Sequence, residues 1–274
     1  SVRVRRHGQP DDGAAEMMRS GLAVRAVAAC LSFGVVCPAF AQQSLDQAAS
    51  DPTASLMSFQ LQGYYTPELH NADGSASLLQ FRAAIPFEIG GYSNIARVTL
   101  PYVTQSASGK TGLSDTTLFN LVTFTRPWGR FGFGAVALLP SGGEGVGAGQ
   151  WALGPAMGFT VQQGPLLWGV FNQNLFTVAE RFDGPDVAIS TLQPIVNYSL
   201  GQGWSVGTSE MNFVYDWDKG AFTSLPFGVK LAKLVRFGKT PVQFQVNYEH
   251  NFYDGGIAPA DTVGVTVKLL LPAG

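Results

Sequence analysis

The last part of the chain alternates between apolar and polar residues, the pattern of a β-strand with two different faces. Between positions 242 and 252, valine, aromatic and histidine side chains alternate with glutamine, asparagine and glutamate. A second run, 262–271, repeats the alternation after a polar loop that contains glycine. Successive side chains of a strand leave opposite faces, so the two runs predict a hairpin. A soluble sandwich and a membrane barrel are both compatible with one such hairpin.

The same alternation recurs upstream, and no helical period of 3.6 persists beyond residue 41. Polar and glycine-containing connections separate the alternating segments. The pattern therefore predicts one domain built from twelve strands. We expect them near 56–65, 75–87, 93–104, 115–126, 130–140, 149–162, 165–179, 187–200, 203–216, 221–236, 240–253 and 260–271.

The connections between these strands are of two kinds. Even-numbered connections are tight, with the sequences EIGGYS, RPWGR, QQGP, LGQG and RFGK. Most odd-numbered connections are longer and more polar, DWDKG being a short exception. Tryptophans lie near strand ends, at Trp128, Trp168 and Trp204 by tight turns and at Trp151 and Trp217 by long loops. Sorted loops, an even strand number and two aromatic girdles predict a transmembrane antiparallel up-and-down β-barrel with periplasmic termini.

The start of the chain contains an export signal. Residues 18–41 have a basic beginning, a short apolar run and the sequence Ala39-Phe40-Ala41, which are the parts of a cleaved secretory signal peptide. Residues 1–17 are polar and irregular, and we interpret them as an unstructured upstream extension. We expect residues 42–55 to be a polar periplasmic lead-in and residues 56–274 to form the barrel, located in the outer membrane of a Gram-negative bacterium.

Composition excludes several classes of function. Both cysteines, Cys30 and Cys37, lie in the expected signal peptide, so the mature chain would have neither disulfides nor thiolate metal ligands. Removal of residues 1–41 takes away five basic and three acidic residues and changes the net charge from −2 to −4. No basic patch indicates a nucleic-acid partner, no cluster has metal-ligand spacing, and we expect no cofactor.

Strand parity predicts which side chains face the lumen. Arg or Lys on the lipid face near mid-membrane costs about 2–4 kcal/mol, so charged and amide side chains are assigned inward. The predicted lumen-lining residues are Arg82, Arg97, Asn120, Asn172, Asn174, Gln193, Asn197, Glu210, Asn212, Lys230, Gln243, Gln245, Asn247, Glu249 and Lys268. They predict either a polar network that fills a narrow barrel or a path for a solute.

Some of these residues have specific predicted contacts. Glu210 and Lys230 lie on neighbouring strands and could pair, whereas Arg82 and Arg97 would repel each other unless an anion or carboxylate lies between them. The consecutive amides at 172–174 break regular alternation. A bulge or an inward distortion would keep all three out of lipid, which makes Asn172 and Asn174 candidates for a constriction.

An enzyme active site has little support in the sequence. Of the three histidines, His7 lies in the expected removed part and His70 in a loop, while His250 faces outward near the loop end of its strand. A surface Ser, His and polar orienter could catalyse acyl transfer, but His250 has no serine nearby in sequence and no recognisable serine motif. An interfacial role for His250 is favoured.

Several runs resemble a known family. They include SDTTLFNLVTF (114–124), FGFGAVALLPSG (131–142), GQWALGPAMGF (149–159), WGVFNQNLFTVA (168–179), LQPIVNYSLGQGWSVGTSEMNFVYDWDKG (192–220) and PVQFQVNYEHNFYD (241–254). These residues are similar to the phenol-degradation meta-pathway family of outer-membrane proteins, whose members are labelled transporters. The resemblance implies a barrel that passes hydrophobic or aromatic compounds and carries over no catalytic residues.

Together these observations predict passive transport of a small, hydrophobic or aromatic, solute through an outer-membrane barrel. The expected partners are the lipid bilayer, the outer-membrane assembly machinery and the solute. One alternative is a non-conducting barrel with a structural or surface-interaction role. The other is an outer-membrane acyl hydrolase.

Overall fold

The computed structural model describes residues 45–272, so the expected extension (1–17), signal peptide (18–41) and residues 42–44 lie outside it. One four-residue helix, α2 (Leu45–Ala48), precedes the strands. Within the described range, no helix is long and apolar enough to cross a membrane. The strands are β1 (Leu56–His70), β2 (Ala76–Ile89), β3 (Tyr92–Gln105), β4 (Gly112–Leu113), β5 (Thr116–Arg126), β6 (Gly129–Leu139), β7 (Gln150–Gln163), β8 (Leu166–Glu180), β9 (Ala188–Gly201), β10 (Trp204–Thr208), β11 (Phe213–Asp216), β12 (Ala221–Ser224), β13 (Pro226–Phe237), β14 (Thr240–Asn251) and β15 (Ala258–Pro272).

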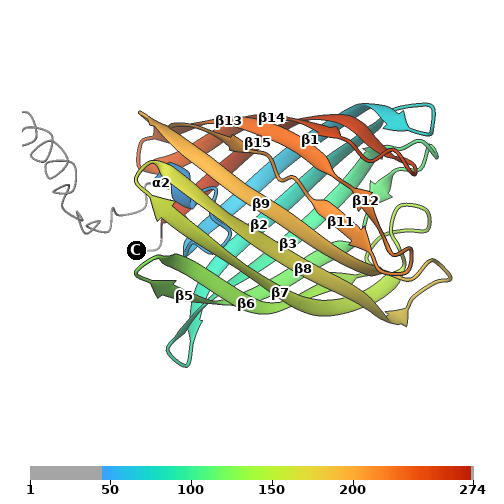
Figure 1. Cartoon of the computed structure of the whole chain (residues 1–274), viewed down its shortest axis with the longest axis horizontal. Coiled ribbons are helices and arrows are strands. Elements are labelled where there is room, and N and C mark those ends of the chain that lie inside the picture. The colour runs from blue at the N-terminus through green and yellow to red at the C-terminus, as the bar shows by residue number, and fades with distance from the viewer. Residues whose placement is uncertain (1–44, 273–274) are drawn as a thin grey trace, which may run out of the picture. The chain divides into compact units, whose positions relative to one another are not determined.

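These strands form one closed antiparallel sheet. Strand β1 pairs with both β2 and β15, which closes the sheet on itself. Strands β10 and β11 follow each other along one position of the barrel, as do β12 and β13 along the next, and β4 is a short addition beside β3. The structure is therefore the closed twelve-stranded barrel that the sequence predicts (Figure 1).

One end of the barrel carries the tight turns. Two residues separate the strands at 90–91, 127–128, 164–165, 202–203 and 238–239. Such two-residue hairpins require left-handed backbone angles, which glycine adopts without steric cost. Gly164 has a φ of 58° and Gly238 a φ of 62°. The longer connections lie at the opposite end, together with the short one between β11 and β12.

The two faces of the barrel wall differ in polarity. Large apolar side chains are exposed on the outside, including Leu61, Phe81, Leu118, Phe133, Val229, Val246 and Val265. Polar side chains on the alternate positions of the same strands are buried inside, including Gln60, Gln62, Gln243 and Lys268. An apolar outer face and a polar interior are those of a transmembrane barrel.

The inner face of β5–β9 departs from this pattern because it is apolar. Phe119, Leu121, Val136, Ala156, Phe171 and Ile195 pack together there. The rings of Phe119 and Phe171 are 5.5 Å apart, and Phe171 is completely buried. Gly158 makes room for this packing, because a Cβ at that position would lie 2.7 Å from the Phe171 ring. The lumen thus has one apolar wall.

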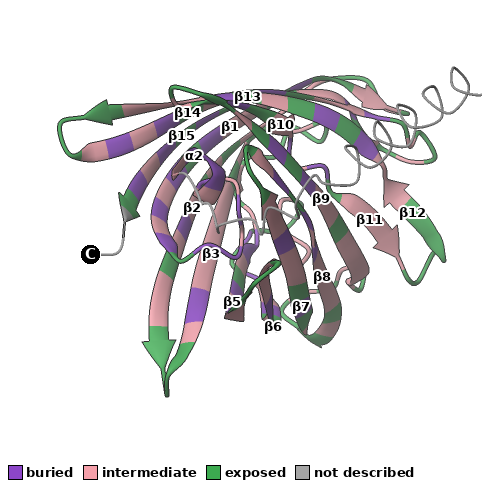
Figure 2. Ribbon diagram, turned by 60° about the vertical axis from the view of Figure 1, so that its left-hand side comes forward, coloured by how far each residue is buried: buried purple, intermediate pink, exposed green. Residues whose placement is uncertain are grey.

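Residues 45–55 lie inside the barrel at the tight-turn end, where Figure 2 shows α2 beside the strands of the wall. Gln47 donates a hydrogen bond to the backbone carbonyl of Gly164 at 3.1 Å. Asp51 accepts from Thr53 and Thr160, at 2.6 and 3.2 Å. These residues are therefore attached to the inner wall, whereas the sequence predicts a lead-in outside the barrel. Their polar side chains can form hydrogen bonds with a polar lumen as well as with water.

The wall is interrupted between β10 and β11. Residues 209–212 belong to no strand, and opposite them β9 contains Pro194, which has no N–H for the sheet. The hydroxyl of Thr208 accepts the Val196 N–H at 3.0 Å, and the Ser209 N–H reaches the Gly228 carbonyl at 3.2 Å. The break frees Glu210 from strand geometry. Its side chain turns into the lumen.

Candidate functional site in the barrel lumen

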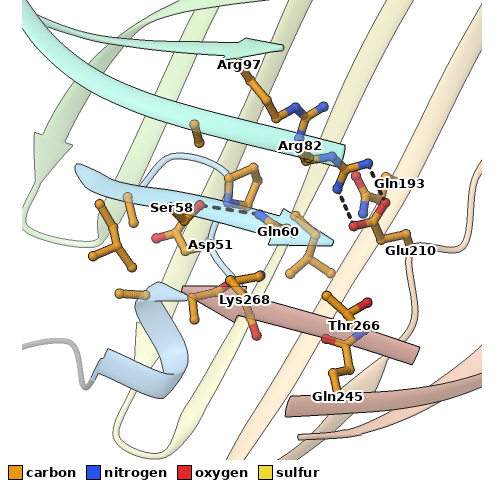
Figure 3. A pocket seen from close by; sticks show the side chains of 18 of the residues that line it. Asp51, Ser58, Gln60, Arg82, Arg97, Gln193, Glu210, Gln245, Thr266 and Lys268 are labelled. Carbon is orange, nitrogen blue, oxygen red and sulfur yellow. Dashed lines mark hydrogen bonds and ion pairs between the residues drawn. The ribbon is translucent and has the colours of Figure 1, made fainter. Parts of the chain in front are cut away.

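A cavity of about 90 Å³ lies in the lumen between residues 48–52 and the inner wall. Side chains of β1, β2, β3, β5, β9, β10, β13, β14 and β15 line it, together with residues of the break between β10 and β11. Figure 3 shows Arg82, Arg97 and Glu210 along one side of this cavity and Lys268, Thr266 and Gln245 along another. The alternation of each strand brings these polar side chains to one space.

Arg82 and Glu210 form a bidentate ion pair across the lumen. The two guanidinium nitrogens donate to the two carboxylate oxygens, at 2.5 Å for Nη1 and Oε1 and 3.0 Å for Nη2 and Oε2. The Arg82 side chain is only 11% exposed. Charge-assisted bidentate pairs of this kind fix orientation as well as adding energy. The predicted pairing of Glu210 with Lys230 is therefore wrong, because the wall break directs the carboxylate toward β2.

Arg97 lies on the apolar side of the same cavity. Its guanidinium carbon is 3.9 Å from the centre of the Phe119 ring and 5.7 Å from that of Phe171. A guanidinium over an aromatic face is attracted by the ring quadrupole. The repulsion expected between Arg82 and Arg97 is thus reduced by two separate partners, a carboxylate for Arg82 and aromatic rings for Arg97.

Two lysines hold the segment that enters the barrel. The Lys230 ammonium donates to the Ser50 hydroxyl at 3.2 Å, and the Lys268 ammonium donates to the Ala49 carbonyl at 2.6 Å. Lys268 is only 9% exposed. Both side chains therefore link the barrel wall to residues that sequence reasoning did not place in the site.

Other predicted lumen residues also face inward. Register places Gln243 opposite Lys268 and Gln245 opposite Thr266, and it places Asn247 opposite Lys230 and Glu249 opposite Gly228. Gln193 lines the cavity, and the Asn197 side chain is completely buried on the inner face of β9. Asn212 is exposed in the segment without strand structure, so parity does not apply to it.

Three asparagines predicted to line the lumen lie on the outer face. Asn120 follows the inward Phe119 and lines an apolar hollow of about 490 Å³ with Ile85, Val98 and Leu118. It donates to the Asn94 side chain at 3.0 Å. The prediction is wrong at this position because the inner face of β5 is apolar, so the polar residue of the alternation points outward. Its hydrogen bond to Asn94 offsets part of the desolvation cost.

Asn172 and Asn174 are outside for the same reason. The register of β8 with β9 is continuous from Gly169 to Phe176, so no bulge occurs at 172–174. Asn174 donates to the Asn172 side chain at 2.7 Å and accepts from the Ser190 hydroxyl. The predicted constriction is therefore absent at these two residues. Only Gln173, between them, has the inward parity.

Neither the surroundings of His250 nor the grouping of metal-ligand residue types forms a site among residues 45–272. Nδ1 of His250 lies 2.9 Å from an Asp261 oxygen, and no serine is among its hydrogen-bond partners in residues 45–272. Within the same range, no group of three or more His, Cys, Asp or Glu side chains is arranged to hold a metal ion. An acyl hydrolase that uses His250 would lack a nucleophile at that position.

Comparisons with known proteins support the fold. No family model and no curated protein matches the chain. The COG4313 outer membrane channel from Pseudomonas putida F1 has a TM-score of 0.58 and 11% identity, over 81% of this chain and 99% of that one. Outer membrane phospholipase A from Escherichia coli has a TM-score of 0.42 and 14% identity, over 78% and 92%. At 11% identity the similarity to the channel supports the outer-membrane barrel fold alone. The phospholipase, with a TM-score of 0.42, is too distant in structure to support a statement about this chain.

Proposed function

We propose that this protein is an outer-membrane channel through which small solutes move passively. The observation that carries the proposal is a charged and amide-rich lumen inside a barrel whose outer face is apolar. A purely structural barrel would be more stable with a well-packed apolar interior, because buried charges carry a desolvation cost. The Pseudomonas putida protein that shares this barrel fold is an outer membrane channel.

The apolar inner wall supports a hydrophobic or aromatic solute. Phe119 and Ile195 line the lumen cavity and give it a surface on which hydrocarbon groups lose contact with water. The resemblance to the phenol-degradation family points to the same class of compound. The charged residues on the other side of the cavity would then orient polar substituents of the solute.

The location follows from the same proposal. Residues 18–41 would direct export and be removed, and the assembly machinery of the outer membrane would insert the barrel. Residues 45–55 would then lie at the periplasmic end of the channel, because the tight turns of such barrels face the periplasm. In this position they would narrow the path.

Single-channel recording of the purified protein in planar bilayers tests the proposal. We expect small conductance steps, and larger steps when residues 42–54 are deleted. Lys230→Glu should shift ion selectivity toward cations, whereas Lys233→Glu on the outer face of β13 is the matched control and should not. Absence of conductance in both forms, together with no solute entry in liposome swelling, would contradict a channel and favour the non-conducting barrel.

A further inference from the structure

Three cations in the lumen cavity form no ion pair with a carboxylate of residues 45–272. The charged residues that line the cavity are Arg82, Arg97, Lys230, Lys268, Asp51 and Glu210. Glu210 pairs with Arg82, and Asp51 lies 3.3 Å from an Arg130 guanidinium nitrogen. Both carboxylates therefore already have arginine partners. In the described part of the chain, no ion pair remains for Arg97, Lys230 or Lys268.

These cations have hydrogen-bond donors that are not used by the contacts described above. A lysine ammonium has three donors, and Lys230 and Lys268 each use one for the segment that enters the barrel. Nε of Arg97 is buried without a partner among residues 45–272. Lys268, Lys230, Arg82 and Arg97 line one cavity, and the only carboxylates among the described residues that line it are Asp51 and Glu210. An anion in this space would accept the unused donors and offset the repulsion.

The opposite side of the cavity suits a short hydrocarbon chain. Ile95, Phe119 and Ile195 line it, and each is at most 5% exposed. The volume of about 90 Å³ is smaller than the cavity of about 150 Å³ that accommodates benzene in an engineered protein. With residues 48–54 in place, the cavity therefore fits a carboxylate with a few carbon atoms better than an aromatic ring.

We infer that this cavity binds the carboxylate of a short-chain organic acid. Arg97, Lys230 and Lys268 hold the carboxylate, and the alkyl part packs against Phe119 and Ile195. The binding site is argued from the cavity alone. Only the role of the acid as a transported solute rests on the proposed channel function. The lumen would then contain a specific anion-binding site in addition to its polar surface and its apolar wall.

Calorimetric titration of the folded full-length barrel with propionate, in detergent at low chloride, tests the site. A ligand of five heavy atoms should bind with a Kd of about a millimole per litre. Propionamide, the neutral isostere, should bind about ten-fold more weakly, because it loses the charge-assisted hydrogen bonds. Equal binding of propionate and propionamide would overturn the inference without any substitution in the protein.

Substitutions in the lumen test which residues bind the carboxylate. Lys268→Gln and Lys230→Gln should each weaken propionate binding about ten-fold, and Lys233→Gln, on the outer face of the same strand as Lys230, should leave it unchanged. Unchanged binding in both lumen variants would overturn the inference. A barrel that conducts but does not bind propionate would contradict only this site, and a barrel that binds propionate but passes no solute would contradict only the channel.

Discussion

The two walls of the lumen have opposite chemistry although both are made of alternating strands. On β14, β15, β1 and β2 many inward positions are amides or charged residues, among them Gln243, Lys268, Gln60 and Arg82. On β5–β8 the central inward positions, among them Phe119, Val136 and Phe171, are apolar and pack together. One wall therefore gives the lumen its charged and amide groups, and the other contributes a packed apolar core that stabilises the barrel.

The largest expected effect comes from breaking the apolar wall. Phe171→Ala should lower the free energy of unfolding by about 4 kcal/mol, because it removes a completely buried ring and leaves a cavity. The measurement is urea unfolding of the barrel in phospholipid vesicles. Phe133→Ala on the outer face is the control and should cost less than half as much, since lipid fills the space. Equal costs would contradict a packed inner wall.

The charged wall should respond to the loss of one partner of its ion pair. Glu210→Ala leaves the Arg82 guanidinium, only 11% exposed, without its carboxylate, and should destabilise the barrel by about 3 kcal/mol. The double variant Arg82→Met with Glu210→Ala should recover much of that loss, because no buried charge remains unpaired. The same unfolding measurement checks both. If the effect of the double variant equalled the sum of the effects of Arg82→Met and Glu210→Ala measured separately, the two residues would not be coupled.

The hydrogen bonds that attach residues 45–55 to the inner wall should control access to the lumen. Asp51→Ala removes the acceptor used by Thr53 and Thr160, which should weaken attachment by about 2 kcal/mol. The segment would then leave the wall at least ten-fold more often. Single-channel recording should show more frequent or larger openings.

A reversible cross-link supplies the control for that prediction. The hydroxyls of Thr53 and Thr160 are 3.1 Å apart, and both native cysteines lie in the expected signal peptide. Thr53→Cys with Thr160→Cys should therefore give a single disulfide. Oxidation should suppress the openings and reduction should restore them. Identical currents in both redox states would show that the segment does not move during conduction.

The sequence predicts the charged wall better than the apolar wall. Where an apolar residue alternates with a polar one, as at Phe244 and Gln245, parity alone assigns the lumen. Around Phe119 and Phe171 both faces contain apolar residues, and the assumption that every amide points inward fails. The Arg82–Glu210 pair could not be predicted either, because it joins residues far apart in the sequence and depends on a break in the wall. Likewise, the polarity of residues 45–55 is equally compatible with water and with a polar lumen.

The smallest expected effect tests the boundary between the walls at Asn120. Because this amide faces outward and makes one hydrogen bond to Asn94, Asn120→Leu should change the free energy of unfolding by no more than about 1 kcal/mol. It should also leave conductance and ion selectivity unchanged in planar bilayers. Gln193→Leu, at an inward position that lines the cavity, is the matched control and should alter both. If the two substitutions changed selectivity alike, Asn120 would have to face the lumen, and the inner surface of β5 would be polar after all.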